Sequence, residues 1–313
     1  MAFTFSIYQL ACDGADWTLT QAVSVPADKV LRGTYSTYSV VSFASVTLLA
    51  AYSKAQGQID LYRLQESQPW IIYSNTLEVG PGWDQLNGFT FSNTAYLMAY
   101  RADTGQFGFY SLDGELRLEA TYLFSRTHAP AVSKGFTTVR PFVLANGLVF
   151  LGYAFETGAV CMYGLTGVVS SPASAPPVLA NAIWDHVWAP GWTRFAFFNL
   201  GGEVFFLKTN TKYPNVNIDH VLDVPANGTI EVATRMDLTD AQALTFVDSF
   251  AMDNGHPHFI AYRPDGLTTV YRIHSDCTGW TSLVSVDAPP NASTVLPGAA
   301  RNQRQQFIYL SED

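Results

Sequence analysis

Short apolar runs recur along the chain, and each is joined to a second, alternating run by a four-residue connection that ends in glycine. The first copy runs from Leu48 to Tyr52, passes Gly57 and continues to Leu64. Alternation of apolar and polar positions is typical of a half-buried β-strand, and a glycine in a tight connection supplies the positive φ of a hairpin turn. Each copy therefore predicts a β-hairpin.

The same pattern returns about every 50 residues, which is the length of one four-stranded propeller blade. The tyrosine and the glycine of the three further copies are Tyr100 and Gly105, Tyr153 and Gly158, and Tyr262 and Gly266. A fifth, degenerate copy spans residues 203–221, and Lys208 is predicted to take the place of its first tyrosine. Five copies predict five blades.

The two ends of the chain each carry half of a sixth hairpin. Residues 306–310 repeat the first strand of the pattern, and residues 5–10, followed by Gly14 and Trp17, repeat the second. Pairing of the two ends would remove open sheet edges. The predicted fold class is an all-β six-bladed β-propeller, with the last blade closed by the N- and C-terminal strands and one domain over residues 1–313.

A further strand is predicted before each hairpin, and in a propeller the first strand of a blade lines the axis. Three of these strands begin near an aromatic residue: Trp83, Phe136 and Trp192. The sequence leaves open whether these rings pack between blades or line the mouth of the channel. Aromatics further along the strands are predicted to pack between blades: Phe89, Phe142, Phe198 and Phe250. Residues 170–177 are predicted to form a surface loop, and residues 182–187 form either a short helix or a loop lined by Trp184 and Trp188.

Composition excludes several classes of function. Only 14% of the residues are charged and the net charge is -9, with no cluster of Lys or Arg, which argues against binding to nucleic acid or to a membrane surface. The start of the chain lacks the features of a leader, so a soluble protein is expected, either cytoplasmic or secreted with its leader removed. Two sequons, at Asn227 and Asn291, leave the compartment open.

Motifs for cofactors and metals are absent from the sequence. The three cysteines are far apart and show no zinc-ligand spacing, and the chain has no phosphate-binding glycine loop and no GxSxG motif. His256 and His258 stand two apart, but a metal site would need a third ligand brought in by the fold. We expect no metal and no cofactor.

The hairpins, together with a following tryptophan as in residues 14–17 and 279–281, resemble the six-bladed propeller of the fungal fucose-specific lectin family over nearly the whole chain. The resemblance implies sugar sites that use an arginine of the first hairpin strand, a glutamate of the second and a stacking aromatic residue. The first strands here have no arginine in this place, and the second strands offer Asp60, Gly108, Cys161, Ile218 and Thr269. Aliphatic residues cannot replace an arginine–carboxylate clamp on sugar hydroxyls. We therefore expect the lectin sites to be lost.

Among propellers of this kind the chain is most similar in character to the fungal hetero-Diels-Alderases of tropolonic sesquiterpene biosynthesis. This resemblance implies a cofactor-free pericyclase of secondary metabolism. In such a reaction a hydroxymethyl tropolone loses water, and the resulting quinone methide adds to a humulene-type sesquiterpene. A protein can accelerate the coupling by holding the two reactants together, by polarising a tropolone oxygen and by excluding water.

Ten residues near the starts of the predicted inner strands are the candidate site for this chemistry. Hydrogen-bond donors to a developing tropolonate oxygen are Arg140 and Arg194, and candidates for proton transfer are Asp84, Tyr35 and Asp248. Residues predicted to bind substrate are Trp83, Phe136, Trp192, Thr193 and Trp188. Packing of the tryptophans and solvation of the arginines are the competing interpretation.

The expected partner is a small apolar or aromatic substrate, with no nucleic acid, no membrane and a possible homodimer. Two other functions stay open at this point. One is a carbohydrate-binding propeller with a divergent, fucose-lectin-like site, and the other is a scaffold that binds a protein. Several bound glycans per chain would favour the lectin, whereas one saturable terpenoid or tropolone site would favour the cyclase.

Overall fold

The computed structural model describes residues 3–43, 46–124, 135–144, 147–166, 179–213, 215–224, 229–239, 244, 246–252, 255–301 and 304–312. Within these ranges the chain forms twenty-four strands in six four-stranded sheets, together with one short 3-10 helix, Ala27–Lys29. The predicted all-β, six-bladed propeller is therefore confirmed. In the described part of the chain no helix is long and apolar enough to cross a membrane.

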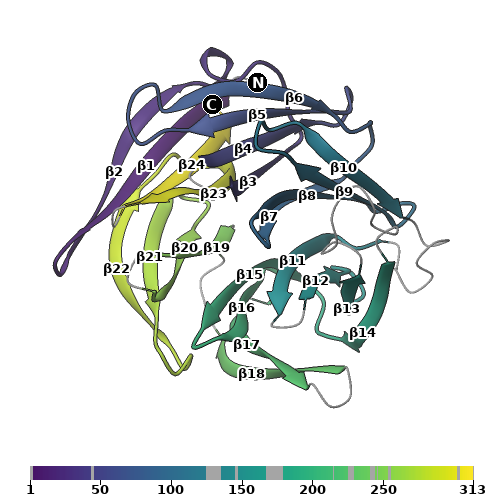
Figure 1. Cartoon of the computed structure of the whole chain (residues 1–313). Coiled ribbons are helices and arrows are strands. Elements are labelled where there is room, and N and C mark those ends of the chain that lie inside the picture. Colours follow the sequence, from purple (N-terminus) through teal and green to yellow (C-terminus); the bar gives the residue numbers. More distant parts are fainter. Residues whose placement is uncertain are drawn as a thin grey trace. The chain divides into compact units, whose positions relative to one another are not determined.

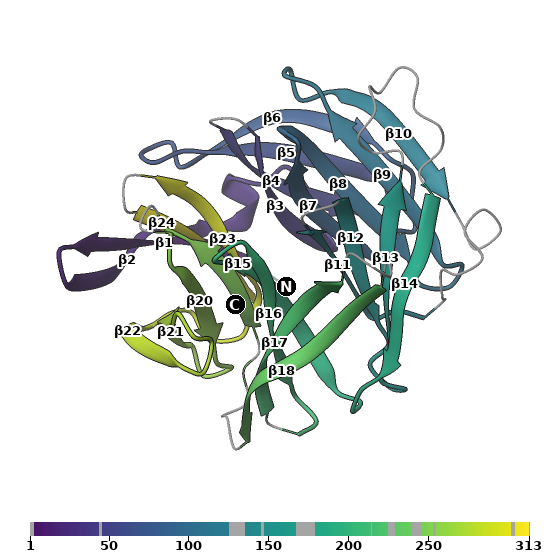
Figure 2. The same ribbon diagram turned by 60° about the horizontal axis from the view of Figure 1, so that its bottom comes forward.

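The chain divides into two compact units. The first unit contains Met1–Arg32, Gly191–Leu222 and Glu231–Asp313, and the second contains Gly33–Pro190 and Asp223–Ile230. Figures 1 and 2 show the sheets, coloured along the sequence.

The second unit holds three sheets in sequence order. Sheet B consists of β3 (Thr37–Phe43), β4 (Val46–Ser53), β5 (Gln58–Leu64) and β6 (Ile71–Glu78). Sheet C consists of β7 (Gln85–Phe91), β8 (Thr94–Arg101), β9 (Gln106–Leu112) and β10 (Leu118–Phe124). Sheet D consists of β11 (Thr138–Leu144), β12 (Gly147–Tyr153), β13 (Ala159–Thr166) and β14 (Leu179–Val187). Residues 182–187 thus belong to an outer strand paired with β13, because edge pairing satisfies their backbone, and both the helix and the loop interpretation were wrong.

The first unit holds two further sheets and most of a third. Sheet A has the order β2 (Asp16–Pro26), β1 (Phe3–Asp13), β24 (Arg304–Glu312) and β23 (Ala292–Arg301). Sheet E consists of β15 (Trp192–Leu200), β16 (Glu203–Asn210), β17 (Asn215–Val224) and β18 (Thr229–Thr239). Sheet F consists of β19 (Phe246–Ala251), β20 (Pro257–Tyr262), β21 (Leu267–Ile273) and β22 (Trp280–Asp287). The strands at the two ends, β1 and β24, pair antiparallel from Phe3 opposite Glu312 to Ala11 opposite Arg304, which confirms the predicted split blade (Figure 1).

The glycines of the hairpin turns adopt the positive φ that the pattern predicts. Their φ angles are 72° at Gly57, 70° at Gly105, 73° at Gly158 and 96° at Gly266. At Gly158 a Cβ atom would also lie 1.9 Å from the carbonyl oxygen of Trp188. Any other residue at this turn would therefore force the following blade connection to move.

The repeated tyrosine at the end of the second strand ties its sheet to the chain that leads into the next one. The Tyr52 hydroxyl donates to the carbonyl oxygen of Gly80 at 3.0 Å and accepts from the amide of Trp83 at 3.1 Å. Corresponding bonds are those of Tyr100 with the Phe136 amide, Tyr153 with the Ala189 carbonyl, and Tyr262 with the Pro289 carbonyl and the Ala292 amide. We call these four residues the linker tyrosines.

The prediction that Lys208 replaces a linker tyrosine was wrong by one residue. A hydroxyl at the start of the inner strand donates to the backbone carbonyl of Tyr52 in sheet B and of Tyr153 in sheet D, and in sheet E the Thr193 hydroxyl donates to the carbonyl of Thr209. Thr209 therefore occupies the tyrosine position. A β-bulge between Trp192 and Arg194 shifts the register of this degenerate copy, which the sequence alone did not reveal.

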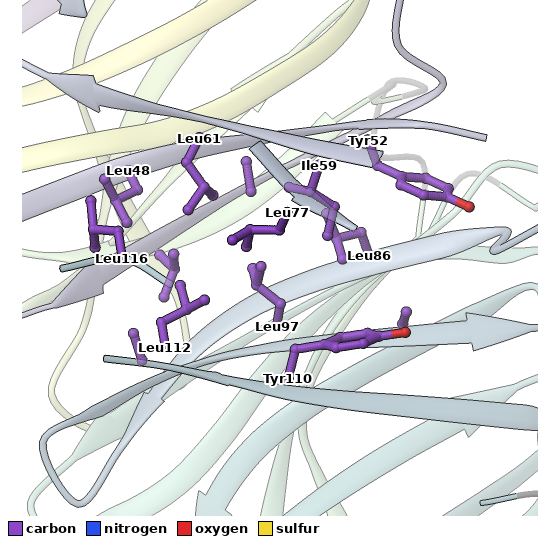
Figure 3. Packing of buried hydrophobic residues seen from close by; sticks show 14 of the residues in the cluster. Leu48, Tyr52, Ile59, Leu61, Leu77, Leu86, Leu97, Tyr110, Leu112 and Leu116 are labelled. Carbon is purple, nitrogen blue, oxygen red and sulfur yellow. The ribbon is translucent and has the colours of Figure 1, made fainter. Parts of the chain in front are cut away.

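The cores lie between adjacent sheets of each unit. Figure 3 shows the core between sheets B and C, where leucines of both sheets interdigitate beside Tyr52 and Tyr110. Phe89 packs on the core between sheets C and D, and Phe198 lies in the core between sheets E and F. The predicted packing of these two phenylalanines is thus what the structure shows. The predicted loop at 170–177 and the sequon at Asn227 lie outside the described residues.

Candidate functional site

A row of polar side chains crosses sheet B on the face opposite its core with sheet C. Pairing sets Tyr38 on β3 opposite Ala51 on β4, Ala51 opposite Asp60 on β5, and Asp60 opposite Thr76 on β6. Because paired residues point to the same side of a sheet, Tyr38, Asp60 and Thr76 share one face. The core residues Ile59 and Leu61 flank Asp60 and face the other way.

Hydroxyl groups converge on the carboxylate of Asp60. Tyr35, from the loop before β3, donates its hydroxyl to Asp60 Oδ2 at 2.5 Å, and the Thr76 hydroxyl donates to Asp60 Oδ1. The hydroxyls of Tyr35 and Tyr62 lie 2.6 Å apart, and the Tyr73 hydroxyl lies 2.9 Å from that of Thr76. We call these five side chains the Tyr35–Asp60 network.

The surroundings of the network keep the hydroxyls of Tyr35 and of the neighbouring Tyr38 protonated. Burial, and then the hydrogen bond to Asp60, raise the pKa of Tyr35 well above the usual range, and burial raises the pKa of Tyr38 to about 12. Tyr35 is only half-buried. A partly accessible phenol that shares its proton with a carboxylate can protonate a leaving group and recover a proton from a second position of the same substrate.

Arg140, on β11 of sheet D, lies apart from this network. Its Nη1 donates to Oδ1 of Asn87 on β7 at 3.0 Å. On β3, Ser39 points to the core face of sheet B, and its Oγ accepts from the amide of Gly88 on β7 at 2.7 Å. The Tyr35–Asp60 network lies on the other face of sheet B. The structure therefore does not assemble Tyr35 and Arg140 into one site.

The predicted acids Asp84 and Asp248 are both held by other groups. Asp84 pairs with Lys54 Nζ at 2.5 Å and accepts from the Ala102 amide at 2.7 Å. Burial acts to raise the pKa of Asp84, but the bond from Lys54 and the amide bond outweigh it and hold the pKa below its ordinary value. In the first unit, Asp248 on β19 is half-buried and its Oδ1 accepts from the Ser249 amide at 2.9 Å.

The aromatic residues predicted to bind substrate are mostly part of the cores. Trp83, Phe136 and Trp192 expose 3%, 1% and 5% of their surface. The indole of Trp83 donates to the Val79 carbonyl and lies under the guanidinium of Arg101, while Phe136 packs between sheets C and D. Packing is the role that the structure shows for these rings, and their predicted contact with substrate stays a prediction.

The remaining predicted residues lie at blade connections. Trp188 follows β14 and is half-buried, with its ring 6.2 Å from that of Tyr153 and 5.7 Å from that of Trp184. Thr193 and Arg194 belong to β15, and the Thr193 hydroxyl is used in the bond to Thr209 described above. Their roles at a site stay predictions.

Sequence reasoning missed most of the Tyr35–Asp60 network. Asp60 carried a signal, since it is the one acid among the five compared positions of the second hairpin strands. Tyr73 and Thr76 carried none, because only the register of β6 brings them beside Asp60. No group of His, Cys, Asp and Glu in the described part of the chain could hold a metal ion.

Comparisons by sequence and by structure gave different outcomes. No protein-family model matches the chain, and no curated protein matches it by sequence. Solved structures do match over most of its length. They include a periplasmic gluconolactonase of Pseudomonas aeruginosa, with a TM-score of 0.52, 10% identity, and coverage of 91% of this chain and 96% of that one.

Two further similar structures come from other bacteria. A 6-phosphogluconolactonase candidate from Bacteroides fragilis has a TM-score of 0.54 and 12% identity, covering 96% of this chain and 88% of that one. A protein from Lactobacillus plantarum has a TM-score of 0.52 and 11% identity, covering 94% and 85%. At such low identities the likeness shows the propeller fold and nothing about the reaction.

Proposed function

We propose that the chain is a cofactor-free cyclase that uses the Tyr35–Asp60 network for proton transfer on a small, largely apolar substrate. The reaction is a hetero-Diels–Alder coupling of a tropolone quinone methide with a humulene-type sesquiterpene. One observation carries the proposal: a half-buried phenol, Tyr35, lies 2.5 Å from a carboxylate and 2.6 Å from a second phenol. Such an arrangement suits the dehydration that must precede the coupling.

Dehydration of the hydroxymethyl tropolone needs an acid and a base at the same time. Tyr35 gives its hydroxyl proton to the departing hydroxyl group, which leaves as water when its C–O bond breaks. The ring hydroxyl of the tropolone loses its proton, and this proton replaces the one that Tyr35 gave up. The Asp60 carboxylate, held by the Thr76 hydroxyl, orients the Tyr35 hydroxyl, and because Tyr35 regains a proton as it gives one up, no phenolate accumulates beside the carboxylate. The substrate loses one water and the protein is unchanged.

The coupling step itself moves no proton. Two bonds form between the quinone methide and the alkene, and the protein contributes by holding the pair in reactive geometry and by keeping water from the quinone methide. Half-buried tyrosine rings lie at the network: Tyr38 packs on Tyr35, and Tyr73 packs on the buried Tyr62. These rings are suited to a flat substrate.

A divergent carbohydrate site is the second candidate function, and Asp60 is the observation that favours it. A carboxylate beside tyrosine rings can bind sugar hydroxyls while a ring packs on the sugar face. The same network would then bind a glycan without any reaction. A protein-binding scaffold has no comparable observation in its favour.

Activity of Tyr35→Phe and Asp60→Asn tests the cyclase. With a hydroxymethyl tropolone and a humulene-type alcohol as substrates, we expect each variant to form adduct about 100-fold more slowly than the natural protein, in line with general acid–base catalysis. Tyr213→Phe is the matched control, because Tyr213 is 52% exposed and lies in the turn between β16 and β17. Circular dichroism establishes that each variant is folded.

The outcomes separate the two candidates. Full activity in folded Tyr35→Phe and Asp60→Asn would overturn the role of the network. Absence of adduct with the natural protein, together with a glycan that binds it and loses affinity in Asp60→Asn, would replace the cyclase with the lectin.

A further inference from the structure

Three neighbouring inner strands of the second unit carry a polar residue at the same register. Each inner strand pairs one residue with its linker tyrosine: Thr37 with Tyr52, Gln85 with Tyr100, and Thr138 with Tyr153. Two residues further along each strand stand Ser39, Asn87 and Arg140. Side chains two apart on a strand point to the same face, so the three occupy equivalent places in sheets B, C and D.

Hydrogen bonds between the sheets bring these side chains next to one another. The Gly88 amide donates to Ser39 Oγ at 2.7 Å, and Arg140 Nη1 donates to Asn87 Oδ1 at 3.0 Å. A Cβ atom at Gly88 would lie 2.7 Å from the Val40 carbonyl oxygen, so β3 and β7 approach as closely as glycine permits. Ser39 thus positions β7, and Asn87 on β7 meets Arg140.

Two buried donors in this group have no acceptor. Asn87 is 4% exposed, and neither its Nδ2 nor the Nε of Arg140 has a hydrogen-bond partner. A buried donor without an acceptor is costly, and natural structures rarely leave one without a functional or structural reason. Here two such donors come from side chains that are already in contact.

Arg140 also lacks a counter-charge. Two other basic side chains of the unit have one: Lys54 pairs with Asp84, and Arg117 pairs with Glu115. Among the residues that the structure describes, no carboxylate lies within ion-pair distance of Arg140. In a chain with a net charge of -9, a half-buried arginine without an acid is suited to an external anion.

We propose that Arg140 and Asn87 form a binding site for a planar carboxylate carried by a small organic ligand. The guanidinium group matches a carboxylate in shape, because its parallel N–H groups can each bond one oxygen, and its single charge suits a monoanion. The Asn87 amide adds a neutral donor beside it. Ser39 is a positioning residue that fixes β7.

This site does not rest on the proposed function. Ser39 faces the core between sheets B and C, whereas Asp60 of the Tyr35–Asp60 network faces the other side of sheet B. Loss of one site should leave the other intact. Tyr35→Phe therefore serves as a variant with unchanged carboxylate binding.

Calorimetric titration with benzoate tests the proposal. We expect one saturable site in the natural protein and a loss of affinity of about 10- to 100-fold in Arg140→Gln, which removes the charge-assisted bonds. Asn87→Asp is expected to abolish binding while keeping the fold, because the new carboxylate takes up the donors of Arg140 itself. Arg140→Lys should bind weakly, since it keeps the charge without the planar fork.

Two controls define the result that would overturn the proposal. Arg117→Gln removes an exposed arginine paired with Glu115 and should bind benzoate as the natural protein does. Inorganic phosphate should bind more weakly than benzoate if shape as well as charge is recognised. The proposal would be overturned if the folded natural protein showed no saturable benzoate binding, or if Arg140→Gln and Asn87→Asp bound benzoate as tightly as the natural protein. Either result would show that Arg140 and Asn87 serve the fold alone.

Discussion

At the scale of single residues, sheet E exchanges one kind of buried pair for another. In sheets B, C, D and F a small residue on the second strand neighbours a tyrosine on the third: Ala51 with Tyr62, Ala99 with Tyr110, Gly152 with Tyr163, and Ala261 with Tyr271. The same two positions in sheet E are Lys208 and Asp219. Lys208 Nζ lies 2.6 Å from Asp219 Oδ2, and 4.6 Å from the centre of the Trp192 ring.

This exchange places a charged pair where sheets B, C, D and F have a neutral pair. Lys208 and Asp219 are almost fully buried, and burial lowers the pKa of Lys208 although Asp219 acts against it. Lysine with aspartate fills a volume similar to that of a small residue with tyrosine. The two opposite charges compensate each other, whereas either charge alone would be buried without a partner.

Removing one partner of this pair should therefore destabilise the protein strongly. Lys208→Met is expected to lower the free energy of unfolding by about 3–5 kcal/mol, because it leaves Asp219 buried and unpaired. The double variant Lys208→Ala, Asp219→Tyr restores the combination found in the other blades and should recover most of the loss. Urea unfolding measures both changes.

The exposed pair Arg117–Glu115 is the control for this comparison. Its side chains are 70% and 69% exposed, and Arg117→Met should change the free energy of unfolding by less than about 1 kcal/mol. Equal effects of Lys208→Met and Arg117→Met would contradict the interpretation.

His258 on β20 is a second buried residue that depends on its protonation state. Its ring is fully buried between Phe250 and Trp17, and its Nδ1 lies 2.8 Å from the carbonyl oxygen of His256. Burial lowers the pKa of His258 to about 4, partly opposed by the bond to His256 and helped by the charge of Arg272. The folded protein therefore holds His258 neutral.

This depressed pKa predicts that stability falls in acid. The unfolded chain binds a proton at His258 near pH 6.5, whereas the folded chain binds it only near pH 4. The contribution is present above about pH 6.5 and is lost as the pH falls from there to about 4. Melting temperatures across this range should decline more steeply for the natural protein than for His258→Gln, and parallel curves would exclude His258 as the cause.

At the scale of elements, the antiparallel hairpin is the unit from which the molecule is built. Its turn needs a glycine with positive φ, and its linker tyrosine bonds to the segment that leads into the next sheet. Sheet A differs because its two halves come from opposite ends of the chain. Only β24 joins β1 to β23.

Deletion of residues 306–313 should therefore disrupt sheet A. It removes nearly all of β24, so β1 and β23 each lose their shared partner and expose an unpaired edge together with the core around Phe307 and Tyr309. We expect loss of the cooperative melting transition or of solubility, measured by circular dichroism and by sedimentation. An unchanged transition would show that β1 and β23 hold without β24.

At the scale of the whole molecule, divergence among the blades is the feature that bears most on function. The third strands carry a different residue at each compared place, from Asp60 in sheet B to Thr269 in sheet F. Equivalent ligand sites in every blade would require similar blades, and these blades differ in their loops, their acidic residues and their buried charges. Each of the two proposed sites accordingly occurs once: the Tyr35–Asp60 network in sheet B, and Asn87 with Arg140 in sheets C and D.

This divergence predicts that fucose does not bind. At the compared positions, none of the second strands of the sheets has an arginine to clamp the sugar. Calorimetry at millimolar fucose should give no heat of binding. A stoichiometry near the number of blades would show that the lectin sites survive in a form that sequence comparison did not detect.

Much of the fold could be predicted from the sequence because its signals are local. Alternation and the glycine turns depend on residues close in the chain, and each end of the chain repeats half of the same local pattern, so the split hairpin was predictable too. The structure confirms all three. Predictions failed where strand pairing, and not the local sequence pattern, decided the structure. Residues 182–187 joined a sheet edge, and Thr209, instead of Lys208, took the tyrosine position, with the pairing to its third strand that the linker tyrosines have.

The sites depended on tertiary structure to a greater degree. The sequence by itself determined that the chain repeats a hairpin, closes its last sheet with its own ends and carries few charges. Only the tertiary structure decided which polar residues meet: Asp60 with Tyr35 and Thr76, Arg140 with Asn87, and Lys208 with Asp219. The physical reason is that a hairpin follows from neighbouring residues, whereas the contact of one side chain with another follows from strand register and from the approach of separate sheets.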